Sequence, residues 1–281
     1  MQESLVGRRP WSECSLTMET FFFLHQTHTL YEKVTITMTI FFTMLSLGLI
    51  LGFAGGGGSG FVLALLISVF NIPIHTALGT STTSMVFTVL SGTASHMREG
   101  NMVIKTGLII GTFGAFGSYT GTLVTGLLPE QLLIWISASL LFLSSFLIWV
   151  RTSIVKQETS DQKVKFFWII APAIGLITGF LSGCFGIGST PLIQLGLLIF
   201  LNMTLQQAAA TSMLILIPVS LFGAIGFYQA GFIDWFLLVQ IVAGTMTGSY
   251  IGAKFTKRAS VLILRTAMIL LPVFGGLLLI W

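Results

Sequence analysis

Charged residues are scarce in this 281-residue chain: Asp, Glu, Lys and Arg together make up only 8% of it. Soluble domains carry roughly 25%. Hydrophobic residues make up 54%, and the mean hydropathy is +0.95. This composition excludes an ordinary soluble domain and predicts an all-α polytopic membrane protein. The net charge of +4 then reflects loop lysines and arginines and predicts no nucleic-acid partner.

Long stretches have no charge at all. Each such gap can hold one or more spans of roughly 20 residues, and the gaps lie between Lys33 and Arg98, Lys105 and Glu130, Glu130 and Arg151, and Lys165 and Asp234. No predicted span contains an acidic residue, which argues against a proton or metal-cation carrier built on buried carboxylates. The spans also lack the nucleophile–base or His/Cys constellation of an enzyme. We therefore predict no enzyme activity, no metal and no cofactor.

Cysteine is almost absent as well. Cys14 and Cys184 have neither metal-binding nor redox spacing, and we interpret Cys184 as a buried structural thiol. Residues 1–33 show no signal-peptide pattern. We expect them to be an N-terminal extension that is disordered or precedes the true start codon, with Met18 and Met38 as alternative starts.

The chain does contain an internal repeat. GLILGF at 48–53 returns as GLITGF at 175–180, a shift of 127 positions (175 minus 48). Further matches share a shift of 131 positions: Gly79-Thr80-Ser81 with Ala210-Thr211-Ser212, Gly92 with Gly223, Gly100 with Gly231, Gly117-Ser118-Tyr119 with Gly248-Ser249-Tyr250, and Gly121 with Gly252. We predict two transmembrane repeats, 34–150 and 167–281, joined by a polar cytoplasmic linker at 151–166.

Each repeat divides into about five helical segments, giving 8–10 transmembrane segments in all. The expected segments are 34–54, 59–71, 76–97, 103–128 and 131–150 in the first repeat, and 167–184, 188–201, 206–229, 233–254 and 259–281 in the second. The second and seventh segments are short and broken: 13 residues extend about 20 Å, less than a hydrocarbon core of about 30 Å.

Loop charges predict the orientation of the repeats. Arg98 and Lys105 flank the third-to-fourth connection of the first repeat, whereas Lys254, Lys257 and Arg258 follow the fourth segment of the second. Positively charged loops favour the cytoplasm. If the linker is cytoplasmic, all positively charged connections lie on the cytoplasmic side only when the two repeats have opposite orientations in the membrane. Both termini are then outside.

Glycine-rich runs precede both short segments. Inverted repeats with broken helices are typical of secondary transporters, which bind substrate near the bilayer midplane. The unpaired N–H groups and dipole of a helix start favour an anion there. The candidate substrate-binding residues are Gly55, Gly56, Gly57, Gly58, Ser59, Gly60, Gly183, Gly186, Gly188 and Ser189 at the two breaks, and Thr80, Ser81, Thr211 and Ser212 in the matched polar clusters.

Some small and polar residues have a structural alternative. Close helix packing is the preferred interpretation of four glycines: Gly48, Gly52, Gly175 and Gly179. Hydroxyl groups can also bond back to carbonyls of their own helix. We favour this for Thr82, Thr83 and Ser84, and leave it open for the matched pairs Thr80-Ser81 and Thr211-Ser212. Arg265 is the one charge well inside a segment, and we expect its side chain to reach toward the cytoplasmic end.

These motifs resemble the sulfite exporter TauE/SafE family of membrane transporters. The glycine-rich opening, the short helix, the (G/A)TS cluster and the later G-S-Y-x-G each occur twice, and the resemblance covers about 34 to 281. It implies a multi-pass permease of the bacterial inner membrane that moves small anions such as sulfite, thiosulfate or short organosulfonates. Gly-Gly-Gly-Gly in one repeat stands where the other has Gly-Cys-Phe-Gly, so we expect chemically unequal openings.

The sequence thus predicts an alternating-access carrier whose partners are a small anion and the lipid bilayer, and it leaves open whether H⁺ or Na⁺ serves as a coupling ion. A carrier of a small carboxylate or of a cation is the main alternative. A membrane-embedded enzyme or assembly factor, or a channel, fits less well, because midplane glycine breaks without rings of charge favour a carrier. The substrate, the direction of transport, the coupling ion and the oligomeric state remain open at this point.

Overall fold

The computed structural model describes residues 38–54, 59–100, 102–154, 167–186, 190–256 and 259–281. The chain divides into two compact units, 1–40 and 41–281. Of the first unit only residues 38–40 are described, and they are helical. Every regular element in the described ranges is an α-helix, which confirms the all-α prediction.

The helices follow the predicted segments closely, five from each predicted repeat. They are Met38–Ala54, α2 Ser59–Ser68, α3 Ile74–Glu99, α4 Ile104–Thr125, α5 Glu130–Ile154, α6 Phe167–Phe185, α7 Thr190–Phe200, α8 Leu205–Gln229, α9 Trp235–Thr256 and α10 Val261–Ile280. Six of the described helices, α4, α5, α6, α8, α9 and α10, are long and apolar enough to cross a membrane. The α3 helix has 26 residues but is rich in Ser and Thr. As predicted, α2 and α7 are short, with 10 and 11 residues.

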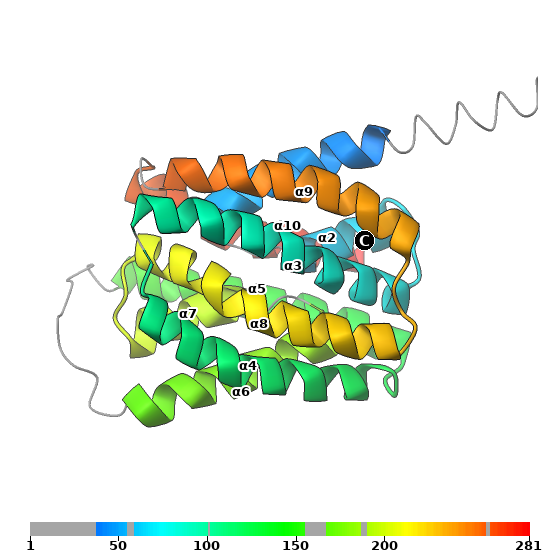
Figure 1. The fold of residues 1–281 in the computed structure, drawn as a ribbon, viewed down its shortest axis with the longest axis horizontal. Helices are drawn as coiled ribbons and strands as arrows, with labels where there is room; N and C mark the ends of the chain where they lie inside the picture. Colours follow the sequence, from blue (N-terminus) through cyan, green and yellow to red (C-terminus); the bar gives the residue numbers. More distant parts are fainter. Residues whose placement is uncertain (1–37, 55–58, 101, 155–166, 187–189, 257–258) are drawn as a thin grey trace, which may run out of the picture. The chain divides into compact units, whose positions relative to one another are not determined.

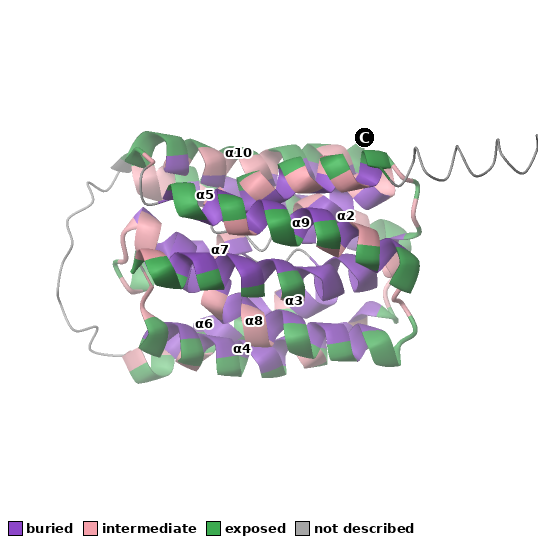
Figure 2. Ribbon diagram, turned by 45° about the horizontal axis from the view of Figure 1, so that its top comes forward, coloured by how far each residue is buried: buried purple, intermediate pink, exposed green. Residues whose placement is uncertain are grey.

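The outer surface of residues 41–281 is apolar. Exposed residues lie mainly on the outer faces of helices such as α4 and α10, and buried residues lie inside (Figure 2). Large hydrophobic side chains such as Phe116, Trp149 and Phe236 are more than a third exposed. An exterior of this kind suits lipid, and the chain is a multi-pass membrane protein.

Helix ends repeat between the halves. Asn71 and Asn202, after the short helices, have positive φ angles of 52° and 48°. Gly100 and Gly231, after α3 and α8, have φ angles of 73° and 75°. Asn and Gly are the residues that tolerate this left-handed conformation best. The members of each pair are 131 positions apart, so the same turn chemistry ends the matching helices.

Glycines bring two helix pairs into backbone contact. Gly48 and Gly52 of the first helix lie against the α9 backbone at Thr245 and Ser249, and a Cβ on Gly48 would lie 2.6 Å from the Thr245 carbonyl oxygen. On the other side, Gly175 and Gly179 of α6 lie against the α4 backbone. The packing interpretation of these glycines is confirmed.

The register of these contacts corrects one sequence match. Gly48 contacts Thr245, and the equivalent contact in the other half joins Gly179 to Gly114. Likewise, Gly52 contacts Ser249, and the equivalent contact joins Gly183 to Ser118. The residues of each contact are 131 positions from their equivalents in the other half (48 and 179, 114 and 245). The 127-position match of GLILGF with GLITGF is therefore wrong by four residues. Four residues are about one helical turn, so either register places glycine on the same helix face.

Helix starts are capped by side chains from the other half. Thr80 Oγ1 of α3 accepts a hydrogen bond from the Asp234 N–H before α9, at 3.1 Å. Thr211 Oγ1 of α8 accepts from the Val103 N–H before α4, also at 3.1 Å. The two acceptor residues are 131 positions apart in the sequence, and so are the two donor residues, so the bonds are equivalent in the two halves. The α3–α4 connection consequently lies near the start of α8, at the opposite end of the helices from the α8–α9 connection (Figure 1).

The short helices pack on the last long helix of the other half. The α2 helix packs against α10 and α3, and α7 packs against α5 and α8. Each interrupted segment is thus enclosed by both halves, which is required where backbone groups are unpaired within a membrane.

We expect Gly179→Ala to destabilise the fold by about 1–3 kcal/mol, because its Cβ would overlap the Gly114 carbonyl. Gly126→Ala is the matched control, since a Cβ there meets only Phe232 at 3.9 Å. Thermal unfolding of the detergent-solubilised chain should show a lowered Tm for Gly179→Ala alone. An unchanged Tm for Gly179→Ala would contradict the close α4–α6 contact.

Candidate functional site

The two helix breaks lie where the sequence predicts them. The first helix ends at Ala54 and α2 begins at Ser59, while α6 ends at Phe185 and α7 begins at Thr190. Ser59 and Thr190 correspond at the 131-position shift. Six of the candidate residues in these breaks, Gly55, Gly56, Gly57, Gly58, Gly188 and Ser189, lie outside the described residues.

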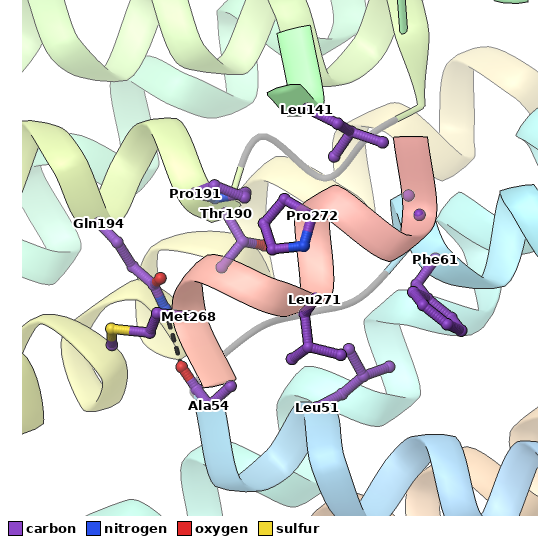
Figure 3. A pocket seen from close by; sticks show the side chains of 12 residues that line it. Leu51, Ala54, Phe61, Leu141, Thr190, Pro191, Gln194, Met268, Leu271 and Pro272 are labelled. Carbon is purple, nitrogen blue, oxygen red and sulfur yellow. Dashed lines mark hydrogen bonds between the residues drawn. The ribbon is translucent and has the colours of Figure 1, made fainter. Parts of the chain in front are cut away.

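A cavity lies between the two breaks. Its lining comes from the end of the first helix, the starts of α2 and α7, α10, and one residue of α5 (Figure 3). The lining residues are Leu51, Ala54, Gly60, Phe61, Leu141, Thr190, Pro191, Gln194, Met268, Leu271, Pro272 and Gly275. The space open to the centre of a water-sized sphere is about 50 Å³, whereas one water needs roughly 10–15 Å³ by that measure. The cavity can therefore hold a small polyatomic ion.

The cavity lies where matching parts of the halves meet. Gly60 and Pro191 are 131 positions apart, and both line it. Leu141 and Pro272 are also 131 apart, and both line it. Residues that match in the repeat thus border the same space.

Gln194 is the polar side chain that sequence reasoning missed. It is only 3% exposed, and its Nε2 donates to the Ala54 carbonyl at 3.0 Å (Figure 3) and to Ser212 Oγ at 3.4 Å. The signal available was one glutamine inside an otherwise apolar short helix. Its counterpart at position 63 (194 minus 131) is Leu63, so the cavity is more polar on its α7 side.

Ser59 presents a second buried polar group, at the start of α2. The residue is 1% exposed, and its Oγ has no hydrogen-bond partner among the residues that the structure describes. An unpaired buried hydroxyl is costly, and the first N–H groups of a helix also lack helical partners. Hydrogen-bond donors therefore gather at this helix start, next to Gly60 in the cavity wall.

The four hydroxyl residues of the matched clusters, Thr80, Ser81, Thr211 and Ser212, do not line the cavity. Thr80 and Thr211 receive the cross-half bonds described above, so their oxygens serve as caps. Ser81 Oγ donates to the Leu78 carbonyl at 3.2 Å. Ser212 Oγ donates to the Ala209 carbonyl at 2.9 Å and connects to the cavity wall through Gln194.

The neighbouring hydroxyls divide into two groups. Thr83 Oγ1 donates to the Gly79 carbonyl at 2.7 Å, and Ser84 Oγ donates to the Ser81 carbonyl at 2.8 Å, which confirms back-bonding for both. For Thr82 that prediction is wrong: its buried Oγ1 has no partner within the described ranges.

Gly183 and Gly186 have packing and turn roles. A Cβ on Gly183 would overlap the Ser118 carbonyl, and one on Gly186 would overlap the Leu78 side chain. Gly186 also has a φ angle of +62°, which side-chain-bearing residues rarely adopt. The chain therefore requires glycine at both positions to leave α6 and approach the break.

Arg265, the cation of α10, does not line the cavity. Its guanidinium donates to Ser153 Oγ near the end of α5. Cys184 is a buried free thiol, as interpreted from the sequence, and its carbonyl accepts from Thr125 Oγ1 at 2.9 Å.

Comparison with known proteins finds a family of membrane transporters. The family model described as "Sulfite exporter TauE/SafE" matches residues 40–279. The probable membrane transporter protein YdhB of Bacillus subtilis (strain 168) is 48% identical over 245 residues, which is 87% of this chain and 100% of YdhB. YunE of the same organism, also described as a probable membrane transporter protein, is 26% identical over 260 residues, 82% of this chain and 95% of its own.

A further relative is a probable membrane transporter protein of Xylella fastidiosa (strain 9a5c), 25% identical over 214 residues, 76% of this chain and 82% of its own. No solved structure matches the chain. The helices and these relatives define the class: the protein is a multi-pass membrane transporter. Within that class, the chain belongs to the sulfite exporter TauE/SafE family.

Thr80 accepts from the N–H of Asp234, whose carboxylate accepts from the first N–H groups of α9. We therefore expect Thr80→Val to lower stability by about 1 kcal/mol through loss of the acceptor for Asp234 N–H. Thr83→Val is the control, since its hydroxyl bonds only within its own helix turn. Thermal unfolding of the purified variants measures both. An equal Tm for the two variants would contradict the capping role.

Proposed function

We propose that this transporter is a secondary carrier of a small anion, held in the cavity between the starts of α2 and α7. The observation that carries the proposal is that both short helices begin at one cavity. The preferred substrate is a sulfur oxyanion or organosulfonate such as sulfite, in keeping with the family description.

Helix electrostatics favour a negative ligand here. Each helix start carries a positive partial charge of about half an elementary charge and up to four N–H groups without helical partners. The first helix directs its negative C-terminal end at the same region, but Gln194 donates to its last carbonyl, that of Ala54. That bond occupies one carbonyl that would otherwise repel an anion.

The neighbouring basic helix ends support inverted halves. Arg98 of α3 donates to the Tyr250 hydroxyl of α9 at 2.6 Å, and Lys254 Nζ lies 4.6 Å from the Tyr250 ring centroid. The basic ends of α3 and α9 are therefore neighbours, as the proposed cytoplasmic face requires. At the matching place in the other half, Tyr119 donates to Gln229 at 3.0 Å without any cation.

A flux assay in proteoliposomes tests the substrate class. We expect uptake of labelled sulfite and methanesulfonate above protein-free vesicles, with acetate slower and labelled Na⁺ moving only if it accompanies an anion. Sulfite and acetate arms separate the preferred substrate from the carboxylate alternative. Uptake of cations without any anion would contradict the proposal.

Ser59→Ala tests whether the hydroxyl of Ser59, the residue before the lining residue Gly60, contributes to anion binding. Since Ser59 Oγ has no described protein partner, its removal should leave Tm unchanged or slightly raised. Hydrogen bonds to charged groups contribute about 1.5–3 kcal/mol, so the apparent affinity for sulfite should fall by at least about tenfold. The control is Ser220→Ala, whose buried hydroxyl donates to the Leu216 carbonyl at 2.6 Å and should affect stability but not affinity. Unaltered affinity in Ser59→Ala would remove this residue from the site.

A further inference from the structure

The cavity has no fixed counter-charge. None of its lining residues is charged, and the whole chain has no charged residue or histidine between Lys33 and His75 or between Lys165 and Asp234. Those two ranges include both glycine-rich breaks. On α10 the nearest cation, Arg265, is bonded to Ser153 Oγ. An anion in the cavity therefore has only neutral donors and helix ends around it.

Neutral donors limit how much charge can be held. The Born cost of taking an ion out of water rises with the square of its charge, so a dianion costs about four times as much as a monoanion of equal size. Two helix starts, at about half an elementary charge each, offset at most roughly one negative charge, and the carbonyl end of the first helix at Ala54 reduces that amount. A second negative charge would have no compensating group.

We propose that the cavity selects its substrate by charge number: it binds monoanions, such as hydrogensulfite or a simple organosulfonate, and rejects dianions such as sulfate, thiosulfate and fully deprotonated sulfite. This inference rests on the proposed anion site and adds the ionisation state of the substrate. The recognised chemistry is a compact SO₃ group with one negative charge and several acceptor oxygens.

A pH dependence follows from the substrate alone. Hydrogensulfite loses its proton near neutral pH, so the monoanion fraction of total sulfite falls about tenfold for each pH unit above that pKa. The apparent affinity for total sulfite should fall in parallel. Methanesulfonate keeps a single charge throughout, so it reports separately any effect of pH on the protein itself.

The test is ligand binding to the purified full-length chain, measured as thermal stabilisation from about pH 6 to about pH 9. The ligands are methanesulfonate, sulfate, thiosulfate and sulfite at equal concentrations and equal ionic strength. Methanesulfonate and sulfate form a matched pair, since both are compact tetrahedral sulfur oxyanions that differ mainly by one charge.

We expect methanesulfonate to bind at least about tenfold more tightly than sulfate or thiosulfate at every pH, and sulfite to lose affinity as the pH rises while methanesulfonate does not. Sulfate binding equal to methanesulfonate binding, or sulfite affinity that is constant or rises with pH, would overturn charge-number selection and leave the anion site standing. If none of the four anions binds, the proposed function fails, and this inference fails with it.

Discussion

Backbone amide and carbonyl groups find no water inside a bilayer, so a helix can stop at that depth only where protein encloses the break. In this chain the enclosure depends on helices that touch backbone to backbone. The first helix meets α9 at Gly48 and Gly52, and α6 meets α4 at Gly179 and Gly183. With no side chains between these backbones, the last turns of the first helix and of α6 pack directly on α9 and α4.

The same constraint explains why the breaks belong to both halves. Each short helix packs on the last helix of the other half, α2 on α10 and α7 on α5. A change in the relation between the halves would therefore change the walls of the cavity directly. The two walls are also unequal, because α7 contributes the polar Thr190 and Gln194 whereas α2 contributes Gly60 and Phe61. That asymmetry gives a substrate one more polar and one more apolar side to contact.

Much of the fold could be predicted from the sequence because the backbone groups of a membrane-spanning segment must be hydrogen-bonded within the protein, which restricts its secondary structure. Charge-free runs mark the helices, and glycine clusters mark the breaks, so the expected segment boundaries differ from the helices by only a few residues in most cases. The register between the first helix and α6 was wrong by one turn, because a glycine-rich face looks alike after four residues. Only contacts with α4 and α9 distinguish the two registers.

The site was harder to predict, since residue type alone does not show which hydroxyl faces a ligand. Thr80 and Thr211 have the composition of ligand-binding residues but cap helices of the other half, across 154 and 108 residues of chain. Gln194 belongs to no repeated motif and was therefore missed. Ser59 was correctly placed at the helix start, and its lack of a described partner is visible only from the packing around it.

The central claim is that the starts of α2 and α7 jointly hold one anion. A crystal structure with bromomethanesulfonate tests it most directly, since bromine gives an anomalous signal that locates the bound molecule. The account predicts one bromine peak in the cavity bordered by Gly60, Thr190 and Gln194, with the sulfonate oxygens within hydrogen-bonding distance of backbone N–H groups from both helices. A peak elsewhere with this cavity empty, or a sulfonate held by only one of the two helix starts, would contradict it.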